Sequence, residues 1–279
     1  MSTRTVQQFV TPAKVLEGDG VPVLRYFNHG TVEDLDPFLM LDVIRLPPGA
    51  KPLAGFPWHP HAGQATFSYV LHGSMEHEDT LGNRGAVGPG GTQYMEAASG
   101  IAHQEMPHFD DQGFWGFQLW INLDHQARLN TPAYQNLTAA QIPVSVTEQA
   151  TVRRVSGPGG AVQSPCRELL FLDVSLAEKA EWEHPLPAEH CAWIMVLEGK
   201  LTMKDATGER VRLSEGQLVQ LSAGESIHVN GDHACRFLCV AAEPVREPVF
   251  WYGPFVARTR DEMESVLARY KKGSFGAPR

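Results

Sequence analysis

The chain contains an internal repeat in which a tetrapeptide of the first half recurs 126 residues later. Val70-Leu71-His72-Gly73 matches Val196-Leu197-Glu198-Gly199. The same offset pairs residues typical of turns, namely Asp79 with Asp205, Gly82 with Gly208 and Gly90 with Gly216. A repeat of this length predicts that one scaffold has been used twice.

Both copies of the scaffold are predicted to consist of short β-strands. Runs with alternating polar and apolar residues, separated by glycine or proline, are typical of a barrel or a sandwich. These runs cover residues 64–75, 92–97, 114–122, 169–176, 192–203, 210–221 and 235–241. A helix is predicted only near the C-terminus, where Thr259 and Glu262 form a capping box and Met263, Val266, Leu267 and Tyr270 form an apolar stripe.

The repeat also predicts two domains of similar length. A chain of 279 residues is near the size at which one core divides into two. The stretch from Leu129 to Pro143 is rich in polar residues and proline and is the best linker. We therefore expect an N-terminal domain of residues 1–132 and a C-terminal domain of residues 133–279 that ends in the helix.

Charge and hydropathy exclude two classes of partner. The chain has 23 Lys and Arg residues against 32 Asp and Glu residues, a formal net charge of −9, which disfavours direct binding to nucleic acid. No stretch approaches the ~18 consecutive apolar residues of a membrane span. Residues 1–8 lack the apolar core of a secretory signal, so we expect a cytoplasmic protein.

Two short motifs in the first half predict a metal site. His59-Pro60-His61 is followed 42 residues after His61 by His103-Gln104-Glu105. Because side chains alternate faces along a strand, each motif directs both of its polar ends to one side. Three imidazoles and one carboxylate suit a borderline divalent metal and leave positions open for oxygen or substrate. Iron is the expected metal, with copper, nickel, zinc or manganese as alternatives.

The second copy of the scaffold lacks all four of these candidate ligands. The repeat offset places Pro185, Pro187, Val229 and Gly231 at the positions of the two motifs. None of these side chains can bind a metal. The sequence therefore predicts one metal-binding domain and one structural domain.

The chain resembles the pirin family of the cupin superfamily over nearly its whole length. The similarity includes residues 35–42 (Leu-Asp-Pro-Phe-Leu-Met-Leu-Asp), both metal motifs, and residues 252–256 (Tyr-Gly-Pro-Phe-Val). The resemblance implies an all-β fold with two cupin barrels, a bicupin, and a short C-terminal helix. It also implies a single non-haem iron(II) in the N-terminal barrel, with ligands at His59, His61, His103 and Glu105.

The resemblance implies two classes of function. As an enzyme, the chain would resemble pirins that act as quercetin 2,3-dioxygenases, which use dioxygen to open the heterocycle of a flavonol with loss of carbon monoxide. Its partners would be a small aromatic substrate and dioxygen. As a redox-sensing regulator, it would instead resemble pirins that bind a protein partner, either a transcription factor or a metabolic enzyme. The dioxygenase is the favoured interpretation.

Two details bear on the chemistry of this site. Pirins usually continue after the second histidine with a sequence like Arg-Gly-Phe-Glu, where this chain has Ala62-Gly63-Gln64-Ala65. Strand alternation predicts that Ala65 faces the metal, so an inward glutamate would be missing and Glu105 would serve as both ligand and catalytic base. His77, in the charged run Glu76-His77-Glu78-Asp79, is predicted to lie at a solvated strand end.

Overall fold

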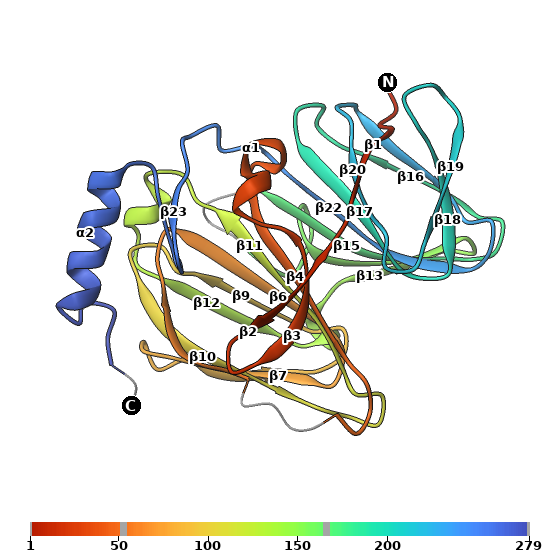
Figure 1. Cartoon of the computed structure of the whole chain (residues 1–279). Coiled ribbons are helices and arrows are strands. Elements are labelled where there is room, and N and C mark those ends of the chain that lie inside the picture. The colour runs from red at the N-terminus through yellow and green to blue at the C-terminus, as the bar shows by residue number, and fades with distance from the viewer. Residues whose placement is uncertain (1, 51–54, 164–167, 278–279) are drawn as a thin grey trace. The chain divides into compact units, whose positions relative to one another are not determined.

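The computed structural model describes residues 2–50, 55–163 and 168–277 (Figure 1). The chain forms two compact units. The first barrel comprises Pro12–Gln141 and Val245–Arg279, and the second barrel comprises Met1–Thr11 and Ile142–Pro244. The expectation of an all-β chain with two barrels and a short C-terminal helix is confirmed.

The first barrel has a seven-stranded sheet in the order β12-β9-β6-β11-β4-β3-β2 and a four-stranded sheet in the order β5-β10-β7-β8. Its helices and 3₁₀ turns are η1 (His29–Thr31), α1 (Val32–Leu35), η2 (Ala127–Leu129), η3 (Ala139–Gln141) and α2 (Arg260–Lys271). Its strands are β2 (Ala13–Glu17), β3 (Val21–Phe27), β4 (Phe38–Leu46), β5 (Phe56–His61), β6 (Gln64–His72), β7 (Ser74–Asp79), β8 (Arg84–Val87), β9 (Thr92–Glu96), β10 (Ile101–His108), β11 (Phe114–Asn122), β12 (Ala133–Leu137), β23 (Phe250–Tyr252) and β24 (Phe255–Ala257).

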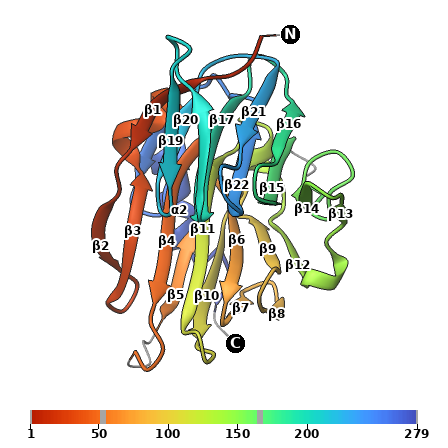
Figure 2. The same cartoon turned by 90° about the vertical axis from the view of Figure 1, so that its right-hand side faces the viewer.

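The second barrel has sheets in the orders β1-β20-β17-β22-β15-β14-β13 and β16-β21-β18-β19 (Figure 2). Its strands are β1 (Val6–Val10), β13 (Val144–Val146), β14 (Ala150–Ser156), β15 (Leu169–Leu176), β16 (Glu181–Pro185), β17 (Cys191–Glu198), β18 (Lys200–Lys204), β19 (Arg210–Ser214), β20 (Leu218–Leu221), β21 (Ser226–Asn230) and β22 (Cys235–Ala242).

The strand orders show the internal repeat directly. Ten strands of the first barrel, β2 to β11, have a counterpart at the same place in the second barrel whose number is higher by eleven, from β13 to β22. The predicted runs at 64–75 and 192–203 are each two strands, because Gly73 and Gly199 turn the chain with φ of 74° and 73°. Asp79 and Asp205 begin matched turns in which their backbone N–H groups donate to Asn83 and Glu209.

The two barrels do not divide the chain at residue 132, as was predicted. The N-terminal segment belongs to the second barrel and the C-terminal segment to the first. The edge position that β12 occupies beside β9 is occupied in the second barrel by the N-terminal strand β1, which pairs with β20. The expected linker therefore contains β12, a strand of the first barrel. No local sequence pattern predicts this exchange, because an edge strand can be supplied from any part of the chain.

A buried arginine fixes the N-terminal segment to the second barrel. Arg4 is 1% exposed, and its guanidinium donates to five backbone carbonyls, those of Pro187, Ala188, His190, Ser222 and Gly224, at 2.7 to 3.2 Å. Burial lowers the pKa of Arg4. These bonds replace hydration for the charge, so the segment is held by more than strand pairing.

The predicted C-terminal helix is confirmed as α2, with Thr259 accepting a hydrogen bond from the Glu262 N–H. It belongs to the first barrel and not to the second, which differs from the predicted domain. Its buried face, Met263 and Val266, packs in one cluster with Ala62 and Phe255. No helix among the described residues is long and apolar enough to cross a membrane.

The interior of the second barrel is filled with apolar side chains. Val229, at the repeat position of His103, is fully buried in a cluster with Ile227, Val196 and Phe237. Its strand β21 occupies the place that β10 has in the first barrel. Apolar packing therefore replaces the polar interior at this position.

Replacing Arg4 by methionine should strongly destabilise the second barrel. The variant keeps the volume but leaves the carbonyl acceptors without donors, and we expect the free energy of unfolding to fall by about 3 kcal/mol or more. Denaturation followed by far-ultraviolet circular dichroism measures the change. Arg210→Met, which removes a largely exposed arginine of the same barrel, is the control. Equal stability of the two variants would contradict the role of Arg4.

Candidate metal centre

Three histidines converge in the first barrel from two neighbouring strands. His59 and His61 point to one side of β5, and His103 lies directly opposite His59 on β10. Each of the three histidines offers one ring nitrogen, and these three atoms lie within 4.8 Å of one another. His61 and His103 are buried and His59 is partly exposed. The alternation expected for both motifs thus brings three of the four predicted ligands together.

Hydrogen bonds leave ring nitrogens of two histidines free to bind a ligand. The Nδ1 atom of His59 lies 2.7 Å from the Pro57 carbonyl, which can only accept, so Nδ1 carries the proton and Nε2 keeps a lone pair. The Nε2 atom of His103 is buried and has no hydrogen-bond partner. A buried orphan acceptor beside two other imidazoles fits a metal ligand.

The third histidine is held by the turn that follows it. The Gln64 amide lies 2.9 Å from the Nδ1 atom of His61 and also donates to the Pro254 carbonyl at 2.9 Å. The Pro254 carbonyl is a hydrogen-bond acceptor for the His61 ring as well. The two contacts require opposite tautomers: Nδ1 accepts if Gln64 is its partner and donates if the Pro254 carbonyl is, and only the second tautomer leaves a lone pair on Nε2 for a metal.

His61 and His103 favour their neutral forms. Burial, followed by the neighbouring His59, holds the pKa of His61 well below its usual range. Burial, and then the charges of His59, His61 and His77, does the same for the pKa of His103. Neutral imidazole is the form that binds a metal, so no proton has to be displaced from these two rings near neutral pH.

Glu105 lies on the same face of β10 as His103 but forms a separate group. Its carboxylate, His103 and His77 each contribute one atom to a cluster that lies within 4.8 Å. One carboxylate oxygen accepts from the Gln118 amide at 2.6 Å, and the other accepts from the Ser68 hydroxyl at 3.2 Å. These donors, on β11 and β6, orient a buried carboxylate beside the histidines.

The prediction for His77 was wrong. This histidine is 2% exposed, and its Nδ1 atom lies 3.3 Å from the Nδ1 atom of His103. Its strand β7 is paired with β10 on one side and β8 on the other, so an inward side chain there cannot reach solvent. Burial raises the pKa of Asp79, but hydrogen bonds from His77 and Asn83 outweigh burial and lower it.

The predicted orientation of Ala65 was also wrong. Gln64 contacts His61 and Ser68 contacts Glu105, so the inward face of β6 carries the even-numbered residues. Ala65 is buried on the opposite face, where it pairs with Glu96 of β9. The alternation fails because Gly63, at φ of 90°, turns the chain between β5 and β6. A glutamate at this position would point away from the histidines.

Ser68 and Gln118 were not identified from the sequence. Gln118 is a polar residue in the mostly apolar strand β11, which is the signal that could have found it, whereas Ser68 lies among other polar residues of β6 and is not distinguished in this way. The other nearby histidines play no part in the cluster. His108 is exposed and faces Glu76, His125 is partly exposed and faces Glu262, and His72 lies against Trp115.

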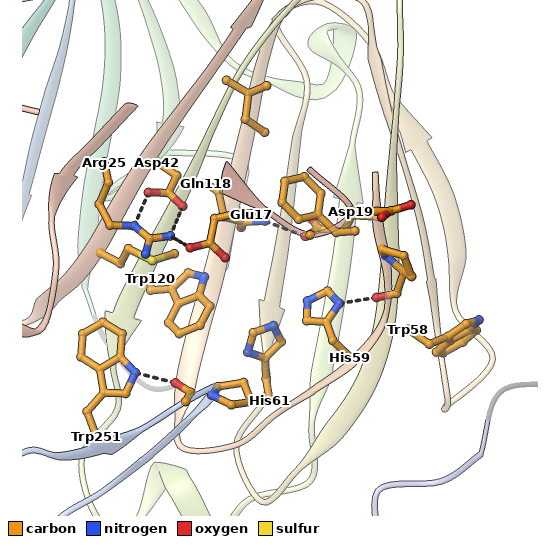
Figure 3. A pocket seen from close by; sticks show the side chains of 18 of the residues that line it. Glu17, Asp19, Arg25, Asp42, Trp58, His59, His61, Gln118, Trp120 and Trp251 are labelled. Carbon is orange, nitrogen blue, oxygen red and sulfur yellow. Dashed lines mark hydrogen bonds and ion pairs between the residues drawn. The ribbon is translucent and has the colours of Figure 1, made fainter. Parts of the chain in front are cut away.

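A cavity of about 830 Å³ in the first barrel opens onto the histidines (Figure 3). His59, His61 and Glu105 contribute to its wall. Aromatic side chains line it further out: Phe56, Trp58, Trp120, Trp251 and His29. Trp120 stands edge-on to His61 with the ring centres 4.8 Å apart, and the Trp251 ring lies 5.8 Å from Trp120.

Another part of the cavity wall is charged. Arg25 forms two hydrogen bonds to the Asp42 carboxylate at 2.6 and 2.7 Å and an ion pair with Glu17 at 2.8 Å. Asp19 adds a third carboxylate to this wall. This part of the wall therefore has three carboxylates and one guanidinium.

Comparison with known proteins agrees with this architecture. Two family models match the chain, that of pirin over residues 20–121 and that of the pirin C-terminal cupin domain over residues 171–276. A Pseudomonas aeruginosa protein provisionally named a quercetin 2,3-dioxygenase is 37% identical, with 97% of each chain covered. Human pirin is 33% identical, covering 100% of this chain and 96% of its own.

Solved structures show the same fold. The quercetin 2,3-dioxygenase of Acinetobacter baumannii superposes with a TM-score of 0.87 and 26% identity, covering 99% of both chains. The Escherichia coli pirin YhhW, solved in complex with nickel(II), has a TM-score of 0.64 and 21% identity, covering 85% of this chain and 98% of its own. With two family models and relatives above 30% identity along its whole length, this chain belongs to the pirin family of cupin proteins.

Proposed function

We propose that the protein is a metal-dependent dioxygenase that acts on quercetin-like flavonols. The observation that carries this proposal is the cavity, whose wall contains His59, His61 and Glu105 together with several aromatic side chains. A volume of about 830 Å³ is within the range of sites that enclose a molecule of this size. The quercetin 2,3-dioxygenase names of two similar proteins support the same reaction class.

The residues that would hold the metal are His59, His61 and His103, with Glu105 as the fourth ligand. Iron(II) is the metal we propose, because three neutral nitrogens and a carboxylate oxygen suit it. When bound there, it would act as a Lewis acid towards a hydroxyl of the substrate and supply a redox centre for reaction with dioxygen. The nickel(II) in the Escherichia coli pirin supports metal binding in this fold.

The cavity wall favours a flat, neutral, hydroxylated substrate. Trp120 and Trp251 present ring surfaces on which an aromatic ligand can pack. Glu17, Asp19 and Asp42 can accept hydrogen bonds from phenolic hydroxyls, and their excess over Arg25 disfavours a substrate that carries a carboxylate. A flavonol has both features, a planar ring system and several hydroxyl donors.

Glu105 is the group that can take the proton of the reacting hydroxyl. It lines the cavity, and Gln118 and Ser68 each donate to one of its oxygens, which leaves acceptor capacity on both. The proton would move from the flavonol hydroxyl to a Glu105 oxygen as the enolate forms. Burial of Glu105 keeps bulk water from competing for that proton.

Iron-loaded protein should consume dioxygen and release carbon monoxide in equal amounts when quercetin is added. Glu105→Gln should lower turnover by about 10²- to 10⁴-fold, the effect ascribed to a positioned general base. Metal content is measured in parallel to separate loss of the base from loss of a ligand. His61→Ala is the metal-depleted control and Glu76→Gln, on an exposed face of β7, is the charge control. Fully loaded wild-type protein without turnover would contradict the dioxygenase and favour the regulator.

Ala65→Glu should not raise turnover, although it restores a residue usual in the family. The new carboxylate would be buried opposite Glu96 on the face turned away from the histidines. We expect unchanged metal affinity and a free energy of unfolding lower by at least ~2 kcal/mol. Ala65→Gln separates the effect of added volume from that of charge. A clear gain in turnover for Ala65→Glu would show that this position does reach the site.

A further inference from the structure

A buried chain of hydrogen bonds leads to the ring nitrogen of His103 that the metal site does not use. The Asp79 carboxylate lies 3.3 Å from the Nε2 atom of His77, and the Nδ1 atom of His77 lies 3.3 Å from the Nδ1 atom of His103. All three residues are 2% exposed or less. The proposed chemistry gives no role to Asp79 or His77.

Both residues are held so that neither can turn. One oxygen of Asp79 accepts from the backbone N–H groups of Leu81 and Asn83 at 2.9 and 3.0 Å, and the other accepts from the Asn83 amide at 2.8 Å. The His77 ring is stacked on Tyr134 of β12, with 4.2 Å between ring centres and 13° between planes. The chain of bonds therefore has a fixed geometry.

This geometry determines where the protons lie. An ionised carboxylate can only accept, so the Nε2 atom of His77 carries a proton, and the Nδ1 atom of a neutral His77 keeps a lone pair. That lone pair must then accept from the Nδ1–H of His103. His103 is left with its own lone pair on Nε2, the buried atom without a partner beside His59 and His61.

We propose that Asp79 and His77 are positioning residues that fix His103 in the tautomer able to bind the metal. The inference rests on the metal site of the proposed function. If His77 donated to His103 instead, the proton of His103 would lie on Nε2, where it would be buried and without an acceptor. Histidine ligands are commonly oriented by such an outer partner, and here the carboxylate acts through a second histidine.

Asp79→Asn should reverse the direction of donation in both hydrogen bonds, the one between residue 79 and His77 and the one between His77 and His103. The asparagine oxygen can keep the two backbone bonds of the turn, but its amide would then donate to His77, and His77 would donate to His103. We expect the Kd for Zn²⁺, measured by competition with a chelator, to rise about 10- to 100-fold. The fold is checked by circular dichroism.

The repeat supplies a matched control. Asp205 makes the same turn in the second barrel, accepting from the N–H groups of Thr207 and Glu209 at 2.9 and 3.0 Å, and its carboxylate is exposed. Asp205→Asn therefore removes the same charge from the same kind of turn, and we expect an unchanged Kd for Zn²⁺. Equal affinities in the two variants would overturn the inference, whereas a wild-type protein that binds no Zn²⁺ would overturn the metal site itself.

Two further measurements separate positioning from mere packing. Long-range ¹H–¹⁵N spectra of the metal-free protein should show His103 protonated at Nδ1 in the wild type and at Nε2 in Asp79→Asn. His77→Gln can donate to Asp79 and accept from His103, so it should retain most of the Zn²⁺ affinity that His77→Phe loses. A wild-type His103 protonated at Nε2, or an equal loss of Zn²⁺ affinity in both His77 variants, would contradict the positioning role of Asp79 and His77.

Discussion

The structure of the site depends on one constraint, which is that buried imidazoles must keep a lone pair free of any protein donor. Burial and mutual repulsion keep His61 and His103 neutral. Acceptors on the far edges of the rings, such as the Pro57 carbonyl for His59, then determine which nitrogen faces the cavity. An orphan buried acceptor is unfavourable in the protein alone, and binding of a metal would relieve that cost.

The two barrels show how the same scaffold meets opposite demands. In the second barrel, the position of His103 is taken by Val229, and apolar packing stabilises the interior without any ligand. In the first barrel, polar groups at inward positions of β6, β10 and β11 are each paired with one another. A polar interior is tolerated because most of these groups have a partner; Oε1 of Gln64 and Nε2 of His103 are buried without one, and the His103 atom lies at the proposed metal position.

The sequence predicted features that depend on short-range geometry. The alternation within β5 and within β10, the turns at Asp79 and Asp205, and the capped C-terminal helix all follow from residues close together in the chain. Alternation could not be carried across Gly63, because one residue with positive φ changes which residues face inward. The prediction for the orientation of Ala65 was wrong for this reason.

Features that depend on distant pairing could not be predicted. A charged run such as that around His77 is usually solvated, and only the pairing of β7 on both sides makes the histidine buried. The same is true of β1, whose place beside β20 depends on a free sheet edge and on carbonyls near Arg4 that are far away in sequence. Sequence motifs identified the histidines of the site but not the residues that orient them.

The most direct test of the proposed centre is X-ray absorption spectroscopy at the metal edge, combined with metal analysis of the intact protein. One metal per chain is expected, with nitrogen and oxygen ligands at about 2.0–2.2 Å and the outer-shell scattering of imidazole rings. A centre ligated by sulfur, a second equivalent of metal, or a first shell without imidazole would contradict a single centre built on His59, His61 and His103.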